Sequence, residues 1–297
     1  MLSEAKHLCA LAALAVAVMG VGCGAPRADR IVVGSKNFTE QAVLGEIIAQ
    51  HIAARTGLAV ERRFYLAGTY ICQQAILAGR IDVYPEYTGT ALTAILKLPA
   101  ASDAAQVFAQ VKTAYAQRFG LLLAPPLGFN NTFALVIRGD DARRDNIRTI
   151  SQAAAYAPKW RPGFGYEFME RPDGYQGLVK TYGLKFGAEP RIMDLGLLYK
   201  ALTSHQVDLV AGNSTDGLIS ALGLTVLDDD RHYFPPYQAV PILRAQTARR
   251  HPEVLTALQD LAGKISAEDM QRMNYAVDGQ HRDARDVAAE FLKSHGL

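Results

Sequence analysis

Cysteine is scarce in this sequence, and its scarcity limits the redox and metal chemistry available. There are three cysteines, and two of them, Cys9 and Cys23, fall close to the N-terminus, which leaves Cys72 in the main body of the chain. One cysteine forms neither an internal disulfide nor a zinc site built from several thiolates. Cys72 lies in an apolar stretch with helical character, and we expect it to be buried in a core.

Recognisable catalytic motifs are also missing. The sequence contains no HExxH, CxxC, P-loop or GxGxxG pattern, and GNSTDG at 212–217 has its second glycine one residue too far from the serine for a nucleophile elbow. The histidines are scattered, and we interpret His205 and His232 as helix-end or loop residues. We interpret the acidic run at 228–230 as solvated loop acids. The sequence therefore predicts no catalytic residue, no metal site and no cofactor.

Excess charge of either sign is lacking too. The 31 basic and 29 acidic side chains give a net charge of +2, and no dense basic stripe is present. Nucleic acid is therefore not an expected partner, since proteins that bind it carry a concentrated basic surface. With 49% hydrophobic and 20% charged residues, the 297-residue chain has an ordinary globular composition and room for two domains.

The longest apolar run is too short for a membrane-spanning helix. It covers residues 8–22, whereas a span needs roughly 20 apolar residues. Lys6 precedes the run and Cys23 follows it in GVGC, which is similar to a bacterial lipobox although Gly20 stands where a branched apolar residue is usual. We predict a signal peptide and tether over 1–28 with a lipidated Cys23, ordinary cleavage nearby being the alternative. The expected location is the periplasm or the outer face of a bacterial cytoplasmic membrane.

From residue 31 onward, short apolar runs alternate with helical stretches. The candidate strands are 31–35, 59–66, 81–87, 133–138, 190–196, 207–214 and 239–244. The candidate helices are 37–57, with Gly57 placed to end it, and 69–79, 102–118, 149–157 and 197–205. This alternation predicts an α/β fold with parallel sheets. No repeat or flexible interior linker is present, so two domains would be joined by short connections.

Polar and aromatic residues gather just past the ends of several of these strands. They occur as Lys36 and Asn37, Tyr87 and Thr90, GFNNTF at 128–133, RPDG at 171–174, GNSTDG at 212–217 and FPPYQAV at 234–240. Open α/β sheets bind small molecules at the carboxyl ends of their strands. The pattern therefore indicates a small-molecule binding site rather than a catalytic centre.

Six motifs occur together in a fixed order along the chain. They are GSKNFTEQ, IDVYPEYTGTAL, LGFNNTFAL, EFMERPDGYQGLVKTYGLKF, NSTDG and DDDRHYFPPYQAVPILR. Together they resemble the substrate-binding proteins of ABC importers for glycine betaine, choline and proline betaine, over about residues 31–290. The resemblance implies a periplasmic binding protein-like type II fold, with two α/β domains, a two-segment hinge and a ligand cleft between them. Domain I would comprise 29–133 plus 237–297, and domain II would comprise 134–236.

The resemblance also implies which residues bind the ligand. A trimethylammonium head donates no conventional hydrogen bond but is attracted to aromatic faces, whereas a carboxylate tail prefers Arg, Lys and polar donors. The cage positions are Tyr87, Phe133, Asn213 and Tyr237; the tail positions are Lys36, Thr90 and Arg171; and Asn131 corresponds to a polar contact near the head.

Two of these positions depart from the family pattern. Phe133 stands where tyrosine is common, and Asn213 stands where some relatives have a cage tyrosine. Losing one aromatic wall weakens the hold on a small quaternary ammonium, or admits a bulkier or more polar ligand. Among the neighbouring residues, we interpret Tyr84 as a packing residue, Glu86 as a structural partner at the following helix and Asp216 as a helix N-cap.

We therefore predict an exported, monomeric binding protein with no catalysis of its own. It would capture a quaternary-ammonium compound such as glycine betaine, choline, carnitine or ergothioneine and deliver it to a membrane permease powered by a separate ATPase. Three alternatives stay open: the same fold binding another zwitterion or an amino acid, a ligand-sensing receptor module, and an exported enzyme that uses Asp or His residues at the cleft.

Overall fold

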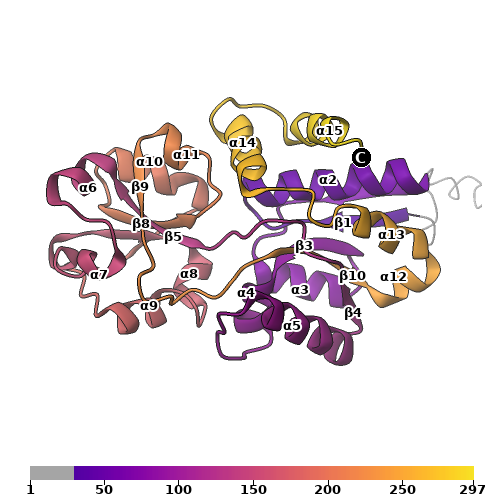
Figure 1. Ribbon diagram of the computed structural model, residues 1–297, viewed down its shortest axis with the longest axis horizontal. Coiled ribbons are helices and arrows are strands. Elements are labelled where there is room, and N and C mark those ends of the chain that lie inside the picture. The colour runs from indigo at the N-terminus through magenta and orange to yellow at the C-terminus, as the bar shows by residue number, and fades with distance from the viewer. Residues whose placement is uncertain (1–29) are drawn as a thin grey trace, which may run out of the picture. The chain divides into compact units, whose positions relative to one another are not determined.

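Two five-stranded sheets organise the computed structural model, which describes residues 30–297 (Figure 1). The first has the order β2-β1-β3-β10-β4, with β1 Arg30–Gly34, β2 Ala59–Arg63, β3 Val83–Tyr87, β4 Leu121–Leu123 and β10 Ala239–Arg244. The second has the order β7-β6-β8-β5-β9, with β5 Phe133–Arg138, β6 Pro162–Phe164, β7 Arg191–Ile192, β8 Leu209–Asn213 and β9 Leu224–Leu227. The predicted signal peptide and Cys23 lie outside the described residues.

Helices accompany each sheet along the chain. Those before β5 and after β10 are α2 Thr39–Thr56, α3 Thr69–Leu77, α4 Thr88–Thr90 continuing into a π-helical turn Ala91–Ile95, α5 Ala104–Phe119, α12 Ala245–Arg250, α13 Pro252–Asp260, α14 Ala267–Asp278 and α15 Ala284–Ser294. Those between β5 and β10 are α6 Gly139–Asp145, α7 Ile150–Ala153, α8 Tyr166–Glu170, α9 Tyr175–Tyr182, α10 Leu198–Thr203 and α11 Leu218–Ala221. Within residues 30–297, every helix is too short or too polar to traverse a lipid bilayer.

Both sheets are mixed, which corrects the expectation of parallel sheets. β1 and β3 are parallel, and β6 is parallel to β7 and β8. β10, however, runs antiparallel to β3 and β4, and β5 runs antiparallel to β8 and β9. Ala239, the first residue of β10, pairs with Tyr87, the last residue of β3. The chain therefore enters β10 beside the carboxyl end of β3 and runs antiparallel to it. An antiparallel pair needs no crossover helix.

The two segments that connect the sheets lie side by side (Figure 1). Asn130 and Gln238 form an isolated antiparallel bridge, and the Asn131 amide donates to the Tyr237 carbonyl at 3.0 Å. The Ala239 amide donates to the Phe129 carbonyl at 3.2 Å on the other side of this bridge. The connections are therefore short and hydrogen-bonded to each other, although the domain limits stay a prediction.

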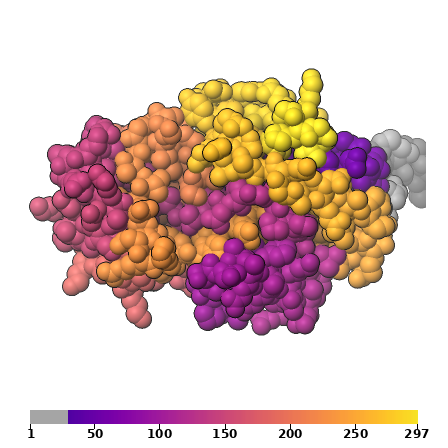
Figure 2. All heavy atoms as spheres, in the orientation of Figure 1, coloured from indigo at the N-terminus to yellow at the C-terminus, as the bar shows by residue number. Residues whose placement is uncertain are grey.

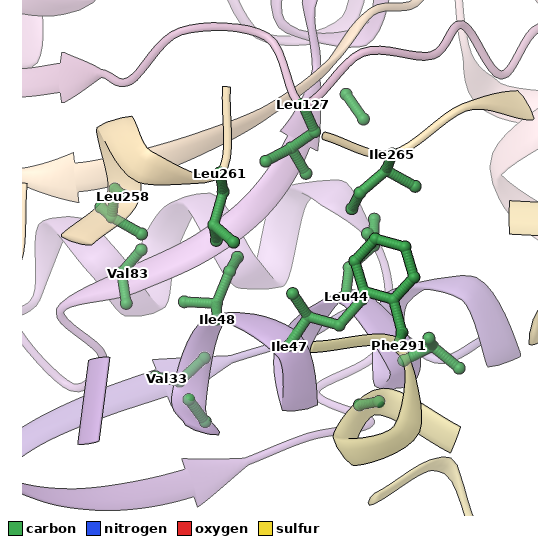
Figure 3. Close-up of a cluster of buried hydrophobic side chains, with 14 of the residues drawn as sticks. Val33, Leu44, Ile47, Ile48, Val83, Leu127, Leu258, Leu261, Ile265 and Phe291 are labelled. Carbon is green, nitrogen blue, oxygen red and sulfur yellow. The ribbon is translucent and has the colours of Figure 1, made fainter. Parts of the chain in front are cut away.

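Helix α2 forms the centre of the largest hydrophobic cluster. It ends where the sequence predicts, because Gly57 adopts the left-handed conformation with φ 71°, which glycine accepts at little cost. Figure 3 shows side chains of α2, including Leu44, Ile47 and Ile48, among those of β1, β3, α13 and α15. The C-terminal helices that cover α2 follow residue 244, where the sequence pattern indicated no element; in Figure 2 they lie at the surface.

Cys72 is buried, as the sequence predicts. Its side chain is fully shielded from solvent in a second hydrophobic cluster that includes Val32, Ile76 and Tyr115. Burial raises the pKa of the Cys72 thiol to about 12. Cys72 is therefore a packing residue and not a reactive thiol.

Candidate binding cavity

A cavity of about 330 Å³ brings together residues that are far apart in the sequence. Its walls come from the loop after β1, the carboxyl end of β3, the two connecting segments, the start of β5, the end of β8 and the region around α8. All of the predicted ligand-binding residues line it: Lys36, Tyr87, Thr90, Asn131, Phe133, Arg171, Asn213 and Tyr237. Their proximity agrees with a shared site, while their individual roles stay predictions.

Lys36 is held at the cavity by a buried carboxylate. Its Nζ forms an ion pair with Glu86, and both side chains are almost completely shielded from solvent. Glu86 also accepts hydrogen bonds from the Tyr87 amide at 2.8 Å and the Tyr84 hydroxyl at 3.4 Å. Glu86 and Tyr84 do not line the cavity, so Glu86 is an internal partner of a cavity cation and Tyr84 is a buried packing residue.

Arg171 is held in the same way by Asp173. Its Nε donates to Asp173 Oδ1 at 2.9 Å and its Nη2 donates to Oδ2, which gives a two-pronged ion pair between buried groups. The Tyr237 hydroxyl donates to Oδ2 at 2.6 Å. Burial on its own raises the pKa of Asp173, but the charge and hydrogen bonds of Arg171 outweigh it and hold that pKa below its ordinary value.

Both cations lie against aromatic rings of the cavity. Lys36 Nζ is 5.1 Å from the centre of the Tyr87 ring. The Arg171 guanidinium is 4.8 Å from the centre of the Phe133 ring and 5.7 Å from that of Tyr237. These distances fall within the roughly 6 Å over which a cation is attracted to a ring face. The aromatic residues predicted to form the cage therefore interact with positive charge already.

Besides Tyr166, two further aromatic residues belong to the cavity wall and were missed by sequence reasoning. Phe38 stacks on Tyr87, with ring centres 6.5 Å apart and an angle of 19° between the planes. Phe168 meets Phe133 edge to face at 4.9 Å. Both lie inside motifs that carry the family resemblance, two residues after Lys36 and three before Arg171, and that closeness was the available signal.

Thr90 and Asn131 offer uncharged polar atoms to the cavity. The Thr90 hydroxyl has no hydrogen-bond partner within the part of the chain that the structure describes. Asn131 Nδ2 donates to the buried Glu40 at 2.8 Å. Asn131 Oδ1, in contrast, is buried and has no partner among residues 30–297. The Thr90 hydroxyl therefore retains hydrogen-bonding capacity that a ligand can use, whereas the Asn131 oxygen is unsatisfied but shielded.

Asn213 is positioned by Asp216. Its backbone amide donates to Asp216 Oδ2 at 2.9 Å, and the Tyr199 hydroxyl donates to the same oxygen at 2.6 Å. Helix α11 is instead preceded by Gly217 as its N-cap, so the interpretation of Asp216 as a helix N-cap is wrong. Asp216 turns back toward the end of β8 because two donors there satisfy its buried oxygen. Burial raises its pKa to about 6.

Glu167 was also missed, and it joins helices that belong to different sheets. This residue of α8 lines the cavity, and its carboxylate accepts hydrogen bonds from the Thr69 amide and, at 3.1 Å, from the Thr69 hydroxyl. Thr69 begins α3, so the carboxylate lies at the positive end of that helix. A Cβ atom on Gly68 would lie 2.0 Å from Glu167 Oε1. The absence of a side chain at Gly68 therefore permits this contact.

The acidic run at 228–230 does not form a metal site. Asp229 accepts hydrogen bonds from the amides of Tyr233 and Phe234 at 3.0 and 2.9 Å, and Asp228 and Asp230 are exposed. Within the described part of the chain, no group of His, Cys, Asp or Glu side chains is arranged to hold a metal ion.

A cavity lined from two mixed α/β sheets that are joined by paired connections defines the class of substrate-binding proteins with a periplasmic type II-like fold. Residues 29–294 match the family model described as the substrate-binding domain of ABC-type glycine betaine transport system, and the chain belongs to that family. It is thus a substrate-binding protein of an ABC importer and not an enzyme, which confirms the resemblance, the fold class and the absence of catalysis predicted from the sequence.

Individual relatives agree with this assignment. The chain is 36% identical over 276 residues to the carnitine transport binding protein OpuCC of Listeria monocytogenes, which covers 92% of this chain and 89% of the relative. It is 36% identical over 268 residues to the ergothioneine transport permease/ergothioneine binding protein EgtU of Helicobacter pylori, over 90% of this chain and 48% of that protein. A crystal structure of a glycine betaine/carnitine/choline ABC transporter superposes with a TM-score of 0.74 and 32% identity, over 90% and 98% of the two chains.

Proposed function

We propose that this protein binds a quaternary-ammonium zwitterion, such as glycine betaine or carnitine, outside the cytoplasm and delivers it to an ABC permease powered by a separate ATPase. The observation that carries the proposal is the meeting of the three predicted cage rings and two paired cations in one cavity of about 330 Å³. Family membership and the ligands named for the relatives support the same ligand class.

The aromatic side chains suit the trimethylammonium head. Tyr87, Phe133 and Tyr237 line the cavity, and each already has a protein cation within 6 Å of its ring centre. A ligand cation on the same rings gains about 0.5–2 kcal/mol per contact, more where water is excluded.

The polar side chains suit the carboxylate tail. Asp173 occupies Nε and Nη2 of Arg171, so the Nη1 donors of that guanidinium stay available. Glu86 occupies one of the three donors of Lys36, and the Thr90 hydroxyl adds another donor. Because buried carboxylates already neutralise both cations, the site favours a zwitterion or a cation over a simple anion.

Calorimetry with the purified protein tests the ligand class. Glycine betaine, choline, carnitine, proline betaine and ergothioneine are titrated separately, and binding of at least one zwitterion is expected. Tyr87→Ala and Tyr237→Ala should each cost on the order of 1–3 kcal/mol of binding. Tyr156→Ala is the matched control, because Tyr156 stacks on Trp160 outside the cavity. If none of the five compounds binds, the proposal is wrong.

Arg171 separates the two halves of the ligand. Arg171→Ala should weaken binding of glycine betaine far more than binding of choline, because choline carries the ammonium head without a carboxylate. Equal losses for the two ligands would mean that Arg171 supports the cavity wall and does not contact the carboxylate.

Asn213 favours a second candidate ligand class in the same fold. It presents a polar amide at a cavity position where some relatives have a cage tyrosine. A more polar or bulkier zwitterion, or an amino acid, is therefore the alternative ligand. Extending the titrations to the standard amino acids distinguishes the two: an amino acid that binds more tightly than every quaternary ammonium favours the alternative.

We also propose that Cys23 anchors the protein to the membrane and that 29–133 with 237–297 and 134–236 form two domains that close on the ligand. The side-by-side connections at Asn130 and Gln238 support the two-segment hinge. Cys23→Ala should release the protein from the membrane fraction. Small-angle scattering should show a smaller radius of gyration when ligand is added, and an unchanged radius contradicts closure.

A further inference from the structure

Glu40 is a buried carboxylate that lies behind the cavity wall without lining it. It belongs to the first turn of α2, and its side chain is only 1% exposed. Oε1 accepts hydrogen bonds from the Tyr87 hydroxyl at 2.6 Å and Asn131 Nδ2 at 2.8 Å. Oε2 accepts hydrogen bonds from the Thr215 hydroxyl and from Asn274 Nδ2, the latter at 3.2 Å.

The two oxygens serve different regions of the protein. The partners of Oε1, Tyr87 and Asn131, both line the cavity. The partners of Oε2 do not: Thr215 lies in the loop after β8 of the second sheet, and Asn274 lies in α14 and also donates to the Thr215 carbonyl at 2.9 Å. Glu40 therefore links the cavity wall directly to a loop of the other sheet.

The chemistry of these bonds determines how Asn131 is oriented. A carboxylate only accepts hydrogen bonds, so the amide nitrogen of Asn131 has to face Glu40. Its oxygen then points away from Glu40 and has no partner within residues 30–297. Asn131 lines the cavity, so Glu40 fixes the orientation of a cavity side chain.

Uncharged groups supply every hydrogen bond to this carboxylate. The ion pairs formed within residues 30–297 do not include Glu40. Burial raises its pKa, and the bonds from Thr215, Tyr87, Asn131 and Asn274 oppose that rise. Moving the Thr215 hydroxyl away therefore removes a hydrogen bond from the buried Oε2 of Glu40. This loss also affects the hydrogen bonds that the other donors make to Glu40.

We propose that Glu40 is a positioning residue that holds Tyr87 and Asn131 in the ligand-binding geometry. It also couples that geometry to the hydrogen bond that Thr215 donates from the loop after β8 of the second sheet. The part that concerns affinity rests on the proposed function, whereas the coupling of the two regions does not. Ligand binding and the approach of the loop after β8 then stabilise each other through one carboxylate.

Thr215→Val is the decisive variant, because it removes the donor while keeping a side chain of the same shape at a position outside the cavity. Thr203→Val is the matched control: its hydroxyl bonds to the Tyr199 carbonyl in α10. In the ligand-free protein, Thr215→Val should speed hydrogen exchange of the backbone around Tyr87 and Asn131 severalfold, and Thr203→Val should leave those amides unchanged. Faster exchange confined to the loop around Thr215 overturns the coupling.

Affinity is then measured with glycine betaine and carnitine. Thr215→Val should weaken binding on the order of tenfold, the loss expected for one hydrogen bond to a charged group. In a Glu40→Gln background the same change should have little further effect, because the two residues act as one unit. Equal losses in both backgrounds overturn the proposal.

The exchange and affinity experiments fail independently. If neither ligand binds the wild-type protein, the proposed ligand class is wrong, and the exchange pattern in the ligand-free protein still decides whether Glu40 couples the two regions. If the ligands bind but Thr215→Val matches the wild type in both experiments, the ligand class stands and the role of Glu40 is rejected.

Discussion

Gly68→Ala is expected to weaken ligand binding without harming the fold. Gly68 precedes α3 in an extended conformation, with φ −93° and ψ −162°, that alanine also adopts. The space for a methyl group, however, is filled by α8: the new Cβ would lie 2.0 Å from Oε1 and 2.4 Å from Cδ of Glu167. The substitution therefore introduces a clash between the regions that meet at the cavity, and no strain within its own loop.

The expected loss of affinity follows from the hydrogen bonds that Glu167 loses when it moves. A carboxylate at the end of a flexible side chain can turn away, but it then loses the hydrogen bonds from the Thr69 amide and hydroxyl. Hydrogen bonds to charged groups contribute about 1.5–3 kcal/mol each, and water at this partly buried rim replaces a share of them. A net loss of about 1–3 kcal/mol remains, which corresponds to roughly 5- to 150-fold weaker binding.

In the ligand-free protein the two proposed domains can separate and relieve this clash, so its stability should rise or stay unchanged. Replacing glycine by alanine in a compatible conformation reduces the entropy of the unfolded chain and stabilises by about 0.4–1 kcal/mol. Calorimetry with a ligand from the panel and thermal unfolding without ligand together measure both effects. A fall in affinity with an unchanged or higher melting temperature is the expected pattern.

Two further variants make this test specific. Gly196→Ala is the matched control, because its Cβ would meet Asp194 Oδ1 at an ordinary 3.4 Å. Combining Gly68→Ala with Glu167→Ala should bind no worse than Glu167→Ala alone, since the clash has lost its partner. If Gly68→Ala binds as tightly as the wild type, the contact between α3 and α8 is not part of the ligand-bound state and the reasoning is wrong.

Three other predictions concern stability and reactivity. The pKa of Asp216 is raised to about 6, so between about pH 4 and pH 6 the folded protein binds more protons than the unfolded chain, and its free energy of unfolding falls as the pH rises through that window. Urea unfolding across this range should show a drop of up to about 3 kcal/mol from this group, and Asp216→Asn should remove it; parallel pH profiles for the two proteins would contradict the assignment. Ile48→Ala, in the cluster around α2, should lower the free energy of unfolding by about 2–5 kcal/mol, and a loss under 1 kcal/mol would mean that the cluster refills the space. Cys72 should resist iodoacetamide in the native protein and react after denaturation, because its thiol is buried with a raised pKa; rapid native labelling would show that α3 opens.

Much of the fold could be read from local sequence. The pattern over 37–57 predicted α2. Its predicted end at Gly57 was correct because the left-handed conformation at a helix end favours glycine independently of tertiary structure. The seven short apolar runs predicted as strands all coincide with strands. Strand direction was less accessible: β5 and β10 run against their neighbours because of where the connecting segments enter each sheet, and no local pattern records that.

The candidate site divides in the same way. The motifs indicated the family and the eight predicted ligand-binding residues, from Lys36 to Tyr237, all of which line the cavity. The partners of those residues were decided by tertiary structure. Asp173 is two residues from Arg171, yet Tyr237, which donates to the same carboxylate, comes from the segment that leads into β10. Hydrogen bonds between distant residues depend on three-dimensional distance and burial.

Glu40 shows most clearly what the sequence alone does not predict. In sequence it is an ordinary acidic residue in the first turn of a helix, where such residues favour the helix dipole and solvent. In the folded protein it is buried, and it joins residues 47, 91, 175 and 234 positions away in the chain. The sequence by itself determined the helix and the class of protein, whereas only the tertiary structure turned this carboxylate inward, because the cost of burying it is met by donors that the fold assembles from four separate segments.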